Sequence, residues 1–194
     1  MYLCDVLILK TKNMERFTDE QLAVLEEDSL KLYYNEAKER MASEVAVEKT
    51  ITERCYMLFA FYYAIASACI GYVLANLERT NDVPMTDGCL VLFAFTCVSI
   101  YKVVVTMLPH PFFSVGLKPE EVNFPEWVKY FKENPNNQFK RLLSEEIVVL
   151  QENIDSQQAI NEKRAKKISE SIYFVAGGTL MAAVCFFLTY LILS

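Results

Sequence analysis

Three apolar stretches decide the fold of this chain: CYMLFAFYYAIASACIGYVLANL at residues 55–77, GCLVLFAFTCVSIYKVVVTML at residues 88–108, and IYFVAGGTLMAAVCFFLTYLIL at residues 172–193. Each has about the 20 residues that a helix needs to cross the hydrocarbon core of a bilayer. Lys102 is the one charged residue within them. Three such runs are not typical of a soluble protein of 194 residues. The lipid bilayer is therefore the first partner that the sequence predicts.

Basic residues outside the three spans predict how the chain is oriented. Eight Lys and Arg residues lie in 1–54, one in 78–87, nine in 109–171, and none after the third span. Short loops rich in Lys and Arg stay on the cytoplasmic side, while acidic residues contribute little to orientation, so the net charge of −6 is a poor guide. We therefore expect a cytoplasmic N-terminus and an external C-terminus.

Helix start and stop signals divide the chain further. Thr18 followed by Gln21 has the spacing of a capping box, and no proline interrupts the sequence from there to Leu77. The stretch 138–193 is also free of proline. We expect each to be one long helix that runs into a span, the first with room for a break, and the polar stretch 78–87 to be a tight turn.

The predicted fold is thus an all-α membrane protein with three transmembrane helices and two long cytoplasmic helical extensions. Its regions are an N-terminal cytoplasmic helical region (1–54), a transmembrane hairpin (55–108), a cytoplasmic connector and long helix (109–171), and the third transmembrane helix (172–194). Residues 1–10 fit either a strand or an apolar tip. An amphipathic piece at 120–133 fits the membrane surface and packing against other helices equally well.

Chemistry-bearing motifs are missing from the sequence. The single histidine, His110, stands between two prolines, and one histidine without nearby Cys or acidic residues does not make a usual metal site. No nucleophile elbow or phosphate-binding glycine loop occurs. The hydroxyl groups in the spans are of the kind that bond their own helix or join helices. We expect neither an enzyme nor a cofactor.

The spans contain two features that bear on assembly. Lys102 fits a side chain that snorkels to the headgroups, or a charge that faces a water-filled pathway. Small residues form stripes that let helices approach closely: Ser67, Gly71 and Ala75 in the first span, and Gly178 and Ala182 in the third. Three spans cannot enclose a conduit, so a pore requires several copies of the chain.

The helix before the third span contains a coiled-coil seam. Leu143, Ile147, Leu150 and Ile154 recur at spacings of four, three and four. Continued in register, the seam turns polar at Gln157, Asn161 and Arg164 and is apolar again at Ile168. Polar seam residues either fix register and oligomer state or face a shared polar cavity.

Basic residues around the polar part of the seam would suit a phosphorylated ligand. They also fit the more ordinary role of contacting anionic lipid headgroups. The candidate ligand-binding residues are Lys163, Arg164, Lys166, Lys167, Lys140, Arg141, Asn161 and Gln157.

The stretch QQAINEKRAK at 157–166, which leads into a terminal span, completes a layout that resembles the small transmembrane effectors of bacterial antiphage systems. The chain is similar to the SLATT-type two-span effectors and to the channel protein of the Hailong system. The third span departs from the two-span plan and favours the channel-type comparison.

The resemblance implies a homo-oligomeric channel of the bacterial inner membrane, with a tetramer favoured. It implies a nucleotide or oligonucleotide ligand, made by a partner nucleotidyltransferase, that binds the cytoplasmic helices and gates the pore. An alternative function of another class is a membrane scaffold that recruits a cytoplasmic partner through coiled-coil contacts.

Overall fold

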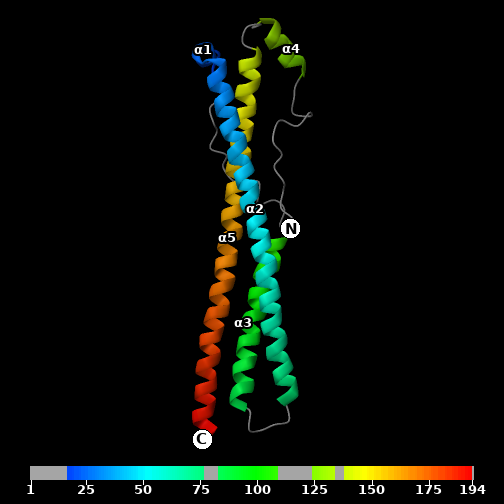
Figure 1. Ribbon diagram of the computed structural model, residues 1–194, viewed down its shortest axis with the longest axis vertical. Helices are drawn as coiled ribbons and strands as arrows, with labels where there is room; N and C mark the ends of the chain where they lie inside the picture. The colour runs from blue at the N-terminus through cyan, green and yellow to red at the C-terminus, as the bar shows by residue number, and fades with distance from the viewer. Residues whose placement is uncertain (1–16, 77–82, 109–123, 134–137, 194) are drawn as a thin grey trace. The chain divides into compact units, whose positions relative to one another are not determined.

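The computed structural model describes residues 17–76, 83–108, 124–133 and 138–193, and the regular structure in these ranges is all helical. The elements are α1 (Asp19–Val24), α2 (Glu27–Asn76), α3 (Val83–Met107), α4 (Phe124–Glu133) and α5 (Gln138–Leu193) (Figure 1). By length and composition, α2, α3 and α5 are each able to cross a membrane. The predicted class is confirmed at this level: an all-α protein with three helices that could span a membrane.

The N-terminal helix start is confirmed, and the break in the first long helix has a definite place. The Oγ1 atom of Thr18 accepts the backbone N–H of Gln21 at 3.3 Å, and Oε1 of Gln21 accepts the backbone N–H of Thr18 at 2.9 Å. This capping box starts α1, which ends where Leu25 adopts an extended backbone. From Glu27 the helix α2 continues for 50 residues into the first apolar run.

Two boundaries differ from those expected. The helix α3 begins at Val83 and not at Gly88, so part of the predicted turn is helical. Pro84 is compatible with this because the N–H groups of a helix's first turn have no intrahelical partner to lose. The helix α4 begins at Phe124, and the predictions for residues 1–10, 120–123 and His110 lie outside the described residues.

The chain divides into two compact units, and α2 and α5 contribute to both. Unit 1 comprises Met1–Val47 and Pro111–Ile160, and unit 2 comprises Glu48–His110 and Asn161–Ser194. All three predicted spans belong to unit 2, and most of the charged sequence belongs to unit 1.

In unit 1, α2 and α5 pack in parallel through their apolar seams. Leu30 of α2 contacts the cluster that holds Leu143 and Ile147 of α5. One to two heptads further along, Met41 packs with Leu150 and Ile154. Each of these side chains is more than nine-tenths buried, which is the arrangement that a heptad seam produces.

In unit 2, α3 lies alongside α2 and α5 (Figure 1), and the three helices share one core. Its buried members are Ile51, Cys55, Tyr62, Val103 and Ile168. Because Ile51 near the start of the unit packs in the same cluster as Val103 near the end of α3, α2 and α3 run antiparallel. The two helices thus form an antiparallel helical hairpin.

The two stripes of small residues have different surroundings. Gly178 of α5 is buried, and a Cβ atom placed there would lie 2.5 Å from Cβ of Phe95 on α3. A Cβ placed on Gly88 of α3 would lie 3.3 Å from the backbone oxygen of Ala182. The stripe of the third span thus packs α5 against α3 within one chain.

The stripe of the first span is open. Ser67, Gly71 and Ala75 are all exposed on α2, and nothing lies within 4 Å of a Cβ placed on Gly71. The surface that these three residues form is therefore available to another helix or to lipid.

We predict that Gly178→Ala destabilises the chain by about 1–3 kcal/mol, because the new methyl group would overlap Phe95. Gly177→Ala is the matched control, since its Cβ would meet nothing within 4 Å and gains the same helix propensity of about 1 kcal/mol. Thermal unfolding of the purified chain in detergent, followed by helical circular dichroism, measures both. Equal melting temperatures for the two variants would contradict the close α3–α5 contact.

Candidate functional site: the polar contacts of unit 2

A buried arginine joins the three helices of unit 2. The Arg164 residue of α5 is 4% exposed, and its guanidinium group contacts both other helices. Its Nη2 atom donates to Oγ1 of Thr52 at 2.9 Å, and Nη1 lies 3.4 Å from a carboxylate oxygen of Glu48, both on α2. Its Nε atom donates to the backbone oxygen of Thr106 on α3 at 3.2 Å.

The contact with Thr106 caps the end of α3. The last four carbonyl groups of a helix have no intrahelical partner, and a cation there also interacts favourably with the helix dipole. Thr106 lies in the last turn of α3, which ends at Met107. Arg164 therefore satisfies a buried carbonyl that would otherwise be unpaired, while Glu48 compensates its charge.

Three lysines on the same turns of α5 have the opposite environment. Lys163 and Lys166 are exposed and Lys167 is half-buried. Arg164 points into the helix bundle, so the basic cluster that the sequence predicts as one ligand site is divided. One cation holds the helices together, and three ammonium groups remain at the surface of unit 2.

A second polar contact lies one to two turns further along α5. Lys102 of α3 pairs with Glu170 of α5 at 2.6 Å, and its ammonium group lies 4.7 Å from the ring centre of Phe174. The ammonium group lowers the pKa of the Glu170 carboxyl, which precedes the apolar run 172–193. The structure thus gives Lys102 an acidic partner within the chain.

Hydroxyl groups complete this layer of contacts. Ser99 of α3 donates to the backbone oxygen of Ser171 at 3.0 Å, and the hydroxyls of Tyr62 and Ser171 lie 3.4 Å apart. Thr96 and Thr106 donate to carbonyls of their own helix, four residues back. Both expected roles of hydroxyls in spans are present.

The other candidate ligand residues lie in different surroundings. Lys140 and Arg141 belong to unit 1, where they donate to the backbone oxygens of Leu22 and Phe17. Gln157 of unit 1 and Asn161 of unit 2 are both more than nine-tenths buried. Of the predicted ligand residues, Lys163, Lys166 and Lys167 thus retain ammonium groups at a described surface.

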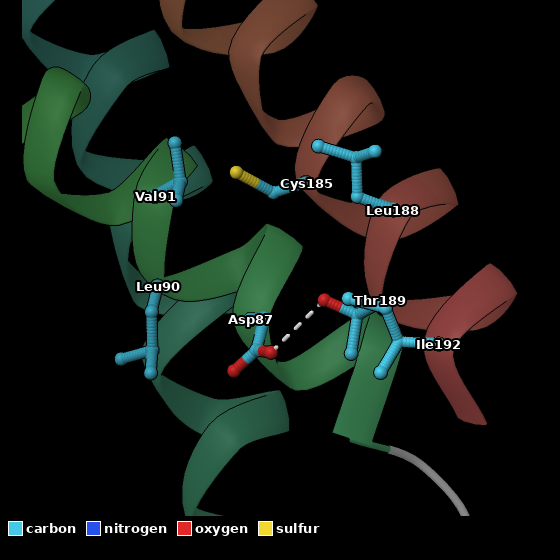
Figure 2. A pocket seen from close by; sticks show the side chains of 7 residues that line it. All are labelled: Asp87, Leu90, Val91, Cys185, Leu188, Thr189 and Ile192. Atoms are coloured by element: carbon cyan, nitrogen blue, oxygen red, sulfur yellow. Dashed lines mark hydrogen bonds between the residues drawn. The ribbon is translucent and has the colours of Figure 1, made fainter.

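A groove between α3 and α5 lies near the ends of their spans. Its cavity is about 410 Å³ and its lining residues are Asp87, Leu90, Val91, Cys185, Leu188, Thr189 and Ile192 (Figure 2). The hydroxyl of Thr189 donates to a carboxylate oxygen of Asp87 at 3.2 Å. This carboxylate lies within a largely apolar lining.

Sequence reasoning missed the acidic partners of these contacts. Glu48 occupies the apolar face of α2 between Val45 and Ile51, and this position is a readable sign that its side chain points inward. No comparable pattern marks Glu170 or Asp87, because each is adjacent to a span and resembles an ordinary flanking charge.

Comparison with protein-family models finds no match, and no curated protein or solved structure is similar to the chain.

We predict that Arg164→Met destabilises the fold by about 3 kcal/mol, because it removes the guanidinium group that contacts the Glu48 carboxylate and the Thr106 carbonyl inside the helix bundle. Lys163→Met is the matched control and is expected to be nearly neutral, since Lys163 is exposed on the same helix. Thermal unfolding in detergent compares them. A neutral Arg164→Met variant would show that the buried contacts do not hold the helices.

Proposed function

We propose that this chain is the subunit of a homo-oligomeric membrane channel that is gated by a phosphorylated ligand. The observation that supports it most is that one stretch of α5 carries both surface cations and a buried cation that contacts the other two helices. Lys163, Lys166 and Lys167 present ammonium groups at the surface, and Arg164 between them contacts both α2 and α3. A ligand that binds this stretch more tightly in one arrangement of the three spans would favour that arrangement over another.

Several copies are needed for a conduit. The interior of unit 2 is filled by side chains such as Tyr62 and Val103, so one chain leaves no water-filled path between its own described spans. The open face of Ser67, Gly71 and Ala75 on α2 is the kind of surface on which membrane helices associate closely. A tetramer of chains, each contributing helices to a central pore, is our proposed assembly.

The proposed setting follows from the layout of the chain. The distribution of Lys and Arg favours a cytoplasmic N-terminus, which places the lysines of α5 on the cytoplasmic side. The resemblance to antiphage effectors supports a channel of the bacterial inner membrane whose opening depolarises an infected cell. Its ligand would then be a nucleotide or oligonucleotide made by a partner nucleotidyltransferase.

We predict that the purified chain forms a defined oligomer and conducts ions in liposomes. Native mass measurement and ion flux on the same preparation test this, with protein-free liposomes as the control. A stable oligomer that carries no flux, with or without added nucleotide extracts, would overturn the channel and favour a membrane scaffold that recruits a cytoplasmic partner.

We predict that replacing Lys163, Lys166 and Lys167 by Gln weakens binding of a labelled single-stranded oligonucleotide at least tenfold. The salt dependence of binding should fall as well, by roughly 0.7 in logarithmic slope for each phosphate that no longer pairs with a lysine. The matched control replaces three other exposed lysines, Lys38, Lys129 and Lys132, by Gln and removes the same charge. Equal affinities of the two variants would exclude the α5 lysines as the ligand site.

A further inference from the structure

Asp87 differs from Lys102 and Arg164, two other charged side chains of unit 2, in its partner. Lys102 is compensated by Glu170 at 2.6 Å, and Arg164 by Glu48 at 3.4 Å. Within the described part of the chain, the partner of the Asp87 carboxylate is the hydroxyl of Thr189, which has no charge. Among these groups, the carboxylate of Asp87 is therefore the one whose partner carries no opposite charge, and it lies in the groove between α3 and α5.

The carboxylate of Asp87 lies in a groove with a mostly apolar lining. Figure 2 shows Asp87 and Thr189 joined by their hydrogen bond, with Leu90, Ile192 and other apolar side chains around them. Asp87 lies only one turn inside α3, which begins at Val83, and Thr189 lies one turn before the end of α5 at Leu193. Asp87 is thus near one end of both helices, in the lining of the groove.

A charged side chain at the depth of a membrane span rarely faces lipid, and the partner of Asp87, Thr189, lies within the third apolar run. Such groups face the interior of a helix assembly or a water-filled cavity, because hydrocarbon does not solvate them. In the proposed assembly we therefore expect the α3–α5 groove to face inward, with one Asp87 from each copy. Rings of acidic side chains at a pore concentrate cations and exclude anions.

We infer that Asp87 makes the pore selective for cations over anions, as a ring of carboxylates at one mouth. The inference rests on the proposed channel and adds the ion that it conducts. Lys102 does not oppose this selectivity, because its positive charge is balanced by Glu170 within the same chain. Thr189 holds the carboxylate on the α5 side of the groove and is a positioning residue.

The test is the reversal potential of the reconstituted channel in planar bilayers across a KCl gradient. The wild-type chain is expected to reverse toward the potassium equilibrium potential. Asp87→Asn should move the reversal potential toward zero, and Asp87→Glu should restore it because the charge returns. Thr189→Val keeps the carboxylate but removes its hydrogen bond, and it should shift the reversal potential less than Asp87→Asn does.

A remote acidic residue provides the matched control. Glu152→Gln removes one exposed carboxylate from α5 in unit 1 and should leave the reversal potential unchanged. Native mass of each variant shows whether the assembly is intact. An anion-selective wild type, or an intact Asp87→Asn assembly with unchanged selectivity, would overturn the role of Asp87 while the channel itself stands. Absence of wild-type current would instead overturn the channel and this inference together.

Discussion

The buried guanidinium group of Arg164 is the constraint on which the arrangement of unit 2 depends. A charge removed from water must find compensating partners, and those of Arg164 come from α2 and from the last turn of α3. Because Glu48, Thr52 and the Thr106 carbonyl meet at one side chain of α5, the three helices have a common register at that level. Apolar packing alone tolerates sliding by a heptad, whereas a displaced arginine would leave several polar groups unpaired at once.

The two units use the same heptad spacing for different purposes. In unit 1 the seam of α5 is apolar at Leu150 and Ile154, and it packs on α2 much as a parallel coiled coil does. In unit 2 the seam includes Arg164 and Ser171, whose hydrogen bonds add to the apolar core around Ile168. A membrane offers little hydrophobic driving force for helices to associate, so polar contacts and close packing at small residues contribute more to helix association there.

This division bears on how a gate could operate. Polar contacts have discrete partners, so a shift of α5 changes which groups are satisfied and favours two distinct arrangements over a continuous range. The surface lysines next to Arg164 would let a bound polyanion act on α5 at that place. The Lys102–Glu170 pair, a turn or two away, would respond to the same shift because it also joins α3 to α5.

The sequence alone predicts the all-α class, the full extent of α5, the C-terminal end of α2, and the inward-facing seam from Leu143 to Ile168, because apolar runs and heptad spacing are local properties of the chain. The tertiary structure was needed to show what each cation contacts. The heptad spacing places Arg164 on the seam and leaves Lys163 off it, and the structure shows Arg164 buried and Lys163 exposed. The partners of Arg164 lie 58 to 116 positions away along the chain, and no local pattern encodes which helices will meet it.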